Sequence, residues 1–229
     1  MNQENGTGVD ATLAHEFVAP IRVLIVDDHE VLGTSLGRVL DEEDDMVTVG
    51  WAQSLAQARA RIPTAAPDVL LLDRRLPDGD GVAAIPELRA LRPSMSVVVL
   101  TAAVADDVLV QAIEVGAAGF VSKNRGLGEV TAAIRAAAAG EAVISPELLS
   151  RLLPKLSRTT GPEPNLTKRE QEVLAMLGKG MSNAAIAEEL TVSVHTVRNH
   201  IANLSAKLGA HSKLEALSIA VRRGLYSGL

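Results

Sequence analysis

Short apolar segments alternate with longer segments of helical periodicity between residues 21 and 139. The expected strands are 21–26, 47–52, 69–72, 96–101 and 118–122, and the expected helices are 31–42, 54–62, 81–91, 106–115 and 127–139. Continuous apolar strands, each followed by a helix, indicate a parallel sheet that is covered on both faces. The predicted fold class is therefore an α/β, flavodoxin-like, doubly wound (βα)5 domain.

The strand pattern disappears in the C-terminal part of the chain. Residues 146–153 predict one short helix, and the Pro, Gly, Ser and Thr content of 154–165 is typical of a linker. Helical segments at 166–180, 182–190, 193–210 and 212–224 follow, and Thr167 with Glu170 forms a capping box at the first. We expect a flexible tail (1–19), an α/β domain (20–142), a helix and linker (143–165) and a smaller all-α domain (166–229).

Composition narrows the classes of protein. Hydrophobic residues make up 47% of the chain, which is ample for a packed core, and the absence of cysteine excludes disulfides and thiolate metal sites. No apolar run is long enough to span a bilayer, so we expect a soluble, cytoplasmic protein with no membrane partner. The net charge of −6 divides into −8 for residues 1–160 and +2 for 161–229. This difference in charge suggests that the two parts of the chain have different tasks, and that residues 161–229 bind an anionic partner.

Three acids follow predicted strands. Asp27 and Asp28 end the first strand, and Asp73 ends the third. These two strands are neighbours at the switch point of a doubly wound sheet, where such folds bind their ligands. Three adjacent carboxylates need a compensating charge, and Mg²⁺ with its preference for oxygen ligands supplies one. A carboxylate beside Mg²⁺ is also a competent nucleophile towards phosphorus.

Two further strand ends carry a hydroxyl and a cation, Thr101 and Lys123. Lys123 could neutralise phosphoryl oxygens and Thr101 could donate a hydrogen bond to one of them, while Phe120 could report the state of the site by changing rotamer. Each residue alone has a simpler interpretation, as a helix cap, a β-former, a solvated charge or a core aromatic. The combination along one doubly wound pattern favours a reactive site.

These residues carry a resemblance to a known family. Asp27–Asp28, "DRRLPDGDG" with Pro77 four residues after Asp73, Thr101 followed by Ala, and "GAAGFVSK" ending at Lys123 make residues 21–140 similar to the receiver domain of two-component response regulators. The resemblance implies a phosphoacceptor, two metal-binding acids, a metal-binding backbone carbonyl, a switch hydroxyl and a switch aromatic. Asp73 would be the phosphoacceptor. Asp28 would bind the metal directly, Asp27 indirectly, and Arg75 through its backbone carbonyl. Thr101 would be the switch hydroxyl and Phe120 the switch aromatic.

Two features depart from the usual receiver pattern. Arg75 and Ala103 occupy positions that tune dephosphorylation in this family, and Lys123 is followed by Asn rather than by the proline that many receivers carry. The lifetime of the phosphoryl group therefore does not follow from the resemblance.

The segment "VHTVRNHIANLSAKL" (194–208) has one apolar helical face, which we expect to be buried, formed by Val194, Val197, Ile201, Leu204 and Leu208. Its other face carries Arg198, Asn199 and Asn203, and Arg can pair with guanine and Asn with adenine in a major groove. The preceding helix (182–190) and a tight turn complete the layout of a helix-turn-helix. On this pattern alone, a polar solvated face on a small helical bundle is the alternative.

Residues 166–220 resemble the DNA-binding domain of the LuxR/NarL class through the motif "SN..IA..L..S..TV..H....KL". The resemblance places Arg198 and Asn199 in the major groove, and it assigns phosphate contacts to Thr196, His200, Lys207, Ser182 and Asn183. Asn203, on the same face of the helix, is a further candidate for DNA binding. It also makes the last helix (212–222), with Leu214, Leu217 and Ile219, a dimer contact on DNA. Ala184–Ala185 and Ala202 stand where the family often has larger side chains.

The two resemblances together imply a response regulator transcription factor rather than an enzyme. A histidine kinase or a small phosphodonor would phosphorylate Asp73 with Mg²⁺, and a homodimer would bind promoter DNA. A haloacid dehalogenase-type phosphatase needs a second Asp two residues after the nucleophile, where this chain has Arg75. A quorum-sensing LuxR protein needs an aromatic pocket, which a chain with 2% aromatic residues does not favour. A degenerate receiver that accepts no phosphate is a further alternative.

Overall fold

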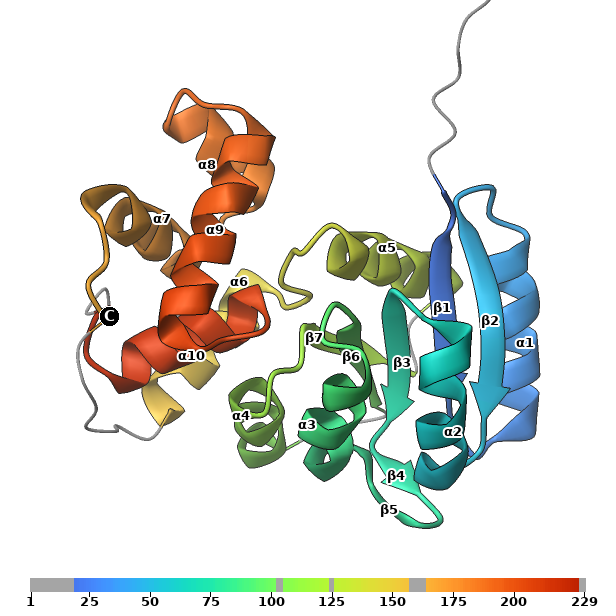
Figure 1. The fold of residues 1–229 in the computed structure, drawn as a ribbon. Coiled ribbons are helices and arrows are strands. Elements are labelled where there is room, and N and C mark those ends of the chain that lie inside the picture. The colour runs from blue at the N-terminus through green and yellow to red at the C-terminus, as the bar shows by residue number, and fades with distance from the viewer. Residues whose placement is uncertain (1–18, 102–104, 124–125, 157–163, 227–229) are drawn as a thin grey trace, which may run out of the picture.

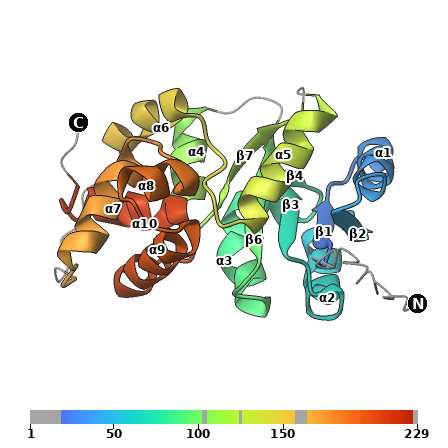
Figure 2. The same ribbon diagram turned by 90° about the horizontal axis from the view of Figure 1, so that it is seen from above.

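The computed structural model describes residues 19–101, 105–123, 126–156 and 164–226, and it consists of an α/β domain beside a helical domain (Figures 1 and 2). The main sheet is parallel, with the strand order β2-β1-β3-β6-β7. Its strands are β1 (Ile21–Val26), β2 (Met46–Ala52), β3 (Val69–Asp73), β6 (Ser96–Thr101) and β7 (Gly119–Ser122). This arrangement confirms the predicted doubly wound sheet and brings the carboxyl ends of β1, β3 and β6 together.

Alternation along the strands divides the core into two layers. Val23 and Ile25 of β1 pack with α1 (Glu30–Asp41) and α5 (Leu127–Ala138) on one face of the sheet. Leu24 and Val26 face the opposite side, which is covered by α2 (Leu55–Ala65), α3 (Gly81–Leu91) and α4 (Asp106–Glu114). All four side chains are fully buried, so the apolar runs recognised in the sequence follow from burial on both faces.

Local details differ from the expected elements. A small antiparallel pair, β4 (Arg75–Leu76) and β5 (Gly79–Asp80), interrupts the loop after β3. Helix α2 extends to Ala65, beyond its expected end at 62, although it contains Pro63. This proline lies in the last turn, where its missing N–H removes a single hydrogen bond and the chain leaves the helix soon afterwards.

The helical domain contains α7 (Lys168–Gly178), α8 (Asn183–Glu189), α9 (Val194–Leu208) and α10 (Lys213–Arg222). Thr167 and Glu170 form the expected capping box at α7. The expected buried face of α9 is correct except at Val194, which is 37% exposed. Val194 is the first residue of α9, next to the exposed N-cap Ser193.

The two domains share a hydrophobic core. Leu109 and Ile113 of α4 belong to the same buried cluster as Leu214 and Leu217 of α10. Helix α6 (Pro146–Leu152) and the short 3₁₀ helix η1 (Leu153–Lys155) add to this cluster. The linker expected at 154–165 is therefore ordered at its start, since buried Leu156 contributes to the core. Residues 1–18 of the expected tail lie outside the described residues. Among the residues described, no helix is sufficiently long and apolar to cross a membrane.

Candidate functional site: an acidic cluster and a helix-turn-helix

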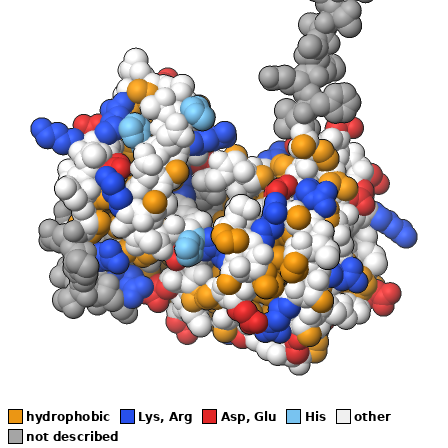
Figure 3. Space-filling model, viewed as in Figure 1, with side chains coloured by type: hydrophobic (Ala, Val, Ile, Leu, Met, Phe, Trp, Pro, Cys, Tyr) orange, Lys and Arg blue, Asp and Glu red, His pale blue; other side chains and the backbone are white. Residues whose placement is uncertain are grey.

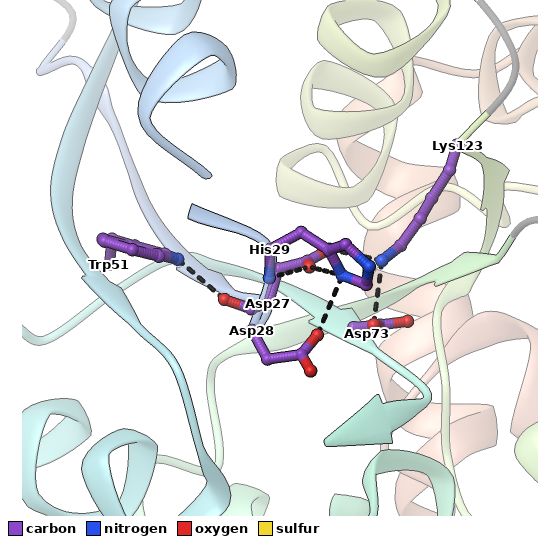
Figure 4. Close-up of polar contacts among 6 residues, drawn as sticks. All are labelled: Asp27, Asp28, His29, Trp51, Asp73 and Lys123. Atoms are coloured by element: carbon purple, nitrogen blue, oxygen red, sulfur yellow. Dashed lines mark hydrogen bonds and ion pairs between the residues drawn. The ribbon is translucent and has the colours of Figure 1, made fainter. Parts of the chain in front are cut away.

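The three acids predicted from the sequence lie together at the carboxyl edge of the sheet (Figure 4). Asp27 follows β1 and is fully buried, Asp73 ends β3 and is 6% exposed, and Asp28 is exposed. Strands β1 and β3 are direct neighbours, with Val26 opposite Leu72, so their carboxyl ends are adjacent. The topology of the sheet therefore forces like charges into one place, which needs a compensating cation.

Lys123 supplies a cation at this edge. Its Nζ lies 2.5 Å from Asp27 Oδ2 and 2.8 Å from Asp73 Oδ2. The backbone N–H of Lys123 donates to the Thr101 carbonyl at 2.7 Å, which fixes the residue at the end of β7. Burial alone would lower the pKa of Lys123, but its hydrogen bonds and charge contacts with Asp27 and Asp73 outweigh burial and raise the pKa. Lys123 is therefore a permanent positive charge directed at both buried acids.

Two neighbours of the acids were not anticipated from the sequence. His29 Nδ1 lies 3.0 Å from Asp27 Oδ1 and 2.9 Å from Asp28 Oδ1. The indole N–H of Trp51, on β2, donates to the backbone carbonyl of Asp27 at 2.8 Å. His29 directly follows the two acids and could have been noticed from its position. The role of Trp51 depends on the pairing of β1 with β2, which gives no local signal.

The chemistry of this group of residues fits a divalent cation. Ligand atoms of Asp27, Asp28, His29 and Asp73 all lie within 4.8 Å of one another. Three carboxylates form a hard, oxygen-rich donor set of the kind that binds Mg²⁺ in proteins. The site also opens into a cavity of about 680 Å³ that is lined by Asp73, Thr101 and Lys123, among others. A small phosphorylated compound could therefore approach Asp73 directly.

The other acids of the "DRRLPDGDG" loop have structural roles. Asp78 accepts the backbone N–H groups of Leu55 and Ala56 at the start of α2, both at 2.9 Å. Asp80 is the N-cap of α3 and accepts two backbone N–H groups. Gly81 follows at the first turn, where a Cβ would collide with the Asp73 carbonyl. These contacts hold the loop closely around Asp73, which leaves Asp73 as the acid that faces the cavity.

The residues expected to act around the acids lie at the same edge. Thr101 ends β6 and is half-buried at the cavity wall, and Arg75, in β4, also lines the cavity. Phe120 of β7 is half-buried and packs against both the α/β core and the cluster shared by the two domains. Ala103 lies outside the described residues.

The helix-turn-helix expected at 182–208 is present as α8, a turn and α9. Ser193 caps α9, and its backbone carbonyl begins the hydrogen bonding of the helix. Arg198, Asn199 and Asn203 are exposed on α9, while His200 is half-buried. Basic side chains are visible on this domain in Figure 3.

Several residues expected at DNA phosphates have partners inside the protein. The Ser182 hydroxyl caps α8, and the hydroxyls of Thr196 and Ser193 lie 2.8 Å apart. Lys207 Nζ lies 2.7 Å from Glu170 Oε2. Asn183 is only 1% exposed, because it packs where the helical domain meets the α/β domain.

A cleft of about 410 Å³ lies between the side of α9 that carries Arg198 and the α/β domain. Arg198, Ala202 and Ser205 line it on one side, and the C-terminal end of α5 lines it on the other. In this arrangement Arg198 lies at the cleft that faces the receiver-like domain, whereas Asn199 and Asn203 are exposed on α9 outside it.

Comparisons with known proteins match both domains. A family model described as the response regulator receiver domain matches residues 23–135, and one described as bacterial regulatory proteins, luxR family, matches residues 164–220. The DNA-binding transcriptional activator DevR/DosR of Mycobacterium tuberculosis is 34% identical over 203 residues, covering 87% of this chain and 94% of that protein. The response regulator protein VraR of Staphylococcus aureus is 30% identical over 205 residues, and the match covers 90% of this chain and 98% of that protein.

A solved structure of the two-component response regulator RcsB in complex with DNA is 25% identical, with a TM-score of 0.53, and the match covers 89% of this chain and 98% of that one. The receiver match, the luxR match and relatives that align over nearly their whole length agree with one another. The chain therefore belongs to the LuxR-family response regulators, transcription factors that join a receiver domain to a helix-turn-helix DNA-binding domain.

Proposed function

We propose that Asp73 is the phosphoacceptor of this response regulator and that its phosphorylation controls DNA binding by α9. The observation that carries the proposal is the position of Asp73. It is nearly buried, it lies 2.8 Å from the Lys123 ammonium, and it opens into a cavity beside two further acids. A sensor histidine kinase or a small phosphodonor such as acetyl phosphate would supply the phosphoryl group.

The chemical step is a transfer to a carboxylate oxygen. An Asp73 oxygen attacks the phosphorus of acetyl phosphate, the bond from phosphorus to the acetyl oxygen breaks, and acetate leaves with the electron pair. Lys123 neutralises a phosphoryl oxygen, and Thr101 donates a hydrogen bond to another. Asp28, Asp73, the Arg75 backbone carbonyl and, indirectly, Asp27 would hold Mg²⁺, which supplies positive charge to the transferring group when bound. Beyond this self-phosphorylation we propose no enzymatic activity.

The output is regulated access to DNA. In the arrangement described, Arg198 lines the interdomain cleft, Asn183 is buried, and α10 packs against α4. We propose that movement of Thr101 and Phe120 after phosphorylation biases the protein towards an open state. The open form would dimerise on a promoter in the cytoplasm. Arg198, Asn199 and Asn203 would reach bases, and Thr196, His200, Lys207, Ser182 and Asn183 would contact phosphates.

The proposal is tested by intact mass after incubation with Mg²⁺ and acetyl phosphate or phosphoramidate. We expect one added phosphoryl group on the wild type and none on Asp73→Asn. Equal labelling of both proteins would refute the assignment of Asp73. If neither protein is labelled, binding of beryllofluoride to the wild type would indicate a short-lived phosphate. Absence of that binding would support the alternative of a receiver that accepts no phosphate.

A further inference from the structure

A short extended segment, residues 141–145, connects the receiver to the helical domain, and we call it the strap. It follows α5 after a turn at Gly140, and it ends at Ser145, the N-cap of α6. The strap pairs with the outer edge of β7. Phe120 N–H donates to the Val143 carbonyl, and Val143 N–H donates to the Ala118 carbonyl, both at 2.9 Å. It therefore adds a parallel bridge beside the proposed switch aromatic.

The side chains of the strap alternate between the two domains. Val143 packs against the receiver core that contains α1 and α5. Ala142 and Ile144 pack against the cluster that contains the helices of the DNA-binding domain. An extended segment presents successive side chains to opposite sides, so a shift of the strap along or away from β7 changes the packing of both domains together.

The close approach of the strap to β7 depends on Gly119. A Cβ at Gly119 would overlap the carbonyl oxygen of Val143. Phe120, the next residue, contacts both the receiver core and the cluster shared with the helical domain. The backbone of the switch residue and the backbone of the strap are thus joined by a direct hydrogen bond, with no intervening side chain.

Glu141, the first residue of the strap, contacts the helix-turn-helix and the helix after it. Glu141 Oε1 accepts the backbone N–H of Asn183 at 2.8 Å, and Glu141 Oε2 lies 2.7 Å from Lys213 Nζ. Lys213 Nζ also donates to the Asn183 side-chain oxygen and to the Met181 carbonyl, both at 3.1 Å. This network ties the receiver to the starts of α8 and α10 at the same point. Burial lowers the pKa of Lys213 despite the opposing effect of Glu141, so the ammonium depends on that carboxylate for compensation.

We propose that the strap is the element that transmits phosphorylation from the receiver to the DNA-binding domain, and that Glu141 is the residue through which it holds the closed state. The inference rests on the proposed function of Asp73. Movement of Phe120 weakens the pairing of Val143 with β7. The strap then withdraws Glu141 from Asn183 and Lys213, and both residues become available as the domains separate.

Hydrogen exchange followed by mass spectrometry tests the strap without knowledge of the promoter. The probes are peptides that contain the strap, the start of α8 and the start of α10. In the wild type, beryllofluoride with Mg²⁺ is expected to raise exchange in all three peptides. Glu141→Gln is expected to raise it before any activation, by about ten-fold or more, because the variant leaves the Lys213 ammonium buried beside a neutral amide. Phosphorylation of Asp73 is expected to proceed normally in this variant.

Glu189→Gln is the matched control, because Glu189 is exposed at the end of α8, away from the strap. It should exchange like the wild type. The double variant Glu141→Gln/Lys213→Met removes the uncompensated ammonium and should recover much of the protection, which separates release from general unfolding. The proposal is overturned if Glu141→Gln exchanges like the wild type, or if activated wild type keeps full protection of the strap. Failure of the wild type to bind either phosphoryl or beryllofluoride would instead refute the proposed function.

Discussion

Replacing Lys123 with Met tests whether this ammonium compensates the acidic cluster. Lys123 Nζ lies 2.5 Å from Asp27 and 2.8 Å from Asp73, and its side chain is 14% exposed. A pair of unit charges 2.8 Å apart attracts by about 6 kcal/mol at an effective dielectric constant of about 20. Desolvation of the ammonium offsets several kcal/mol of the total, and Met leaves two nearly buried carboxylates without a cation. We therefore expect a loss of about 3 kcal/mol in the free energy of unfolding.

The assay is urea unfolding without divalent cations, followed by fluorescence of Trp51, the single tryptophan of the chain. Mg²⁺ should narrow the difference between variant and wild type, because the cation replaces the lost positive charge. Arg59→Met is the control. Arg59 pairs with Glu87 at 2.6 Å, but both side chains are more than one third exposed, so solvent screens the pair and its loss should cost much less stability than the loss of Lys123. If Lys123→Met is as stable as this control in the absence of Mg²⁺, the reasoning is refuted.

Three further predictions concern the metal site, the core and DNA. Mg²⁺ should change the fluorescence emission of Trp51, whose indole hydrogen-bonds the Asp27 carbonyl. Asp28→Asn should raise the Mg²⁺ concentration at half-maximal change at least ten-fold, and an unchanged titration would argue against Asp28 as a metal ligand. Leu204→Ala should cost about 3 kcal/mol in thermal or urea unfolding because Leu204 is fully buried, whereas Val194→Ala, at an exposed position, should cost less than about 0.5 kcal/mol. Arg198→Ala should lower the affinity of the activated protein for its promoter by about ten-fold or more with loss of base preference, as measured by fluorescence anisotropy; a uniform loss over all sequences would indicate a phosphate contact instead.

Much of the fold could be predicted because burial leaves a local pattern. Strands buried on both faces are continuous apolar runs, and a sheet with alternating strands and helices has few possible topologies. Because β1 and β3 are neighbouring parallel strands, the proximity of Asp27 and Asp73 can be predicted from the topology alone. The β4–β5 pair was missed because its two-residue strands are too short to show a period.

The contacts between distant segments could not be predicted. Trp51 of β2 reaches Asp27 at the end of the neighbouring strand β1, and Glu141 reaches Asn183 and Lys213 in another domain. Trp51 and Glu141 lie in segments in which the sequence shows no motif. The same limit applies to Asn183, which resembles a DNA-contacting residue by its motif and is buried at the domain interface in the structure.

The central claim is that the state of the receiver determines whether the DNA-reading face of α9 is accessible. The chain has no cysteine, so spin labels can be attached at Ala83→Cys on α3 and Ala206→Cys on α9, two exposed helical positions. Pulsed electron spin resonance then measures the distance between the domains with and without beryllofluoride and Mg²⁺. We expect a single narrow distance distribution in the resting protein and a longer, broader one after activation. An unchanged distribution in a protein that demonstrably binds beryllofluoride would contradict it.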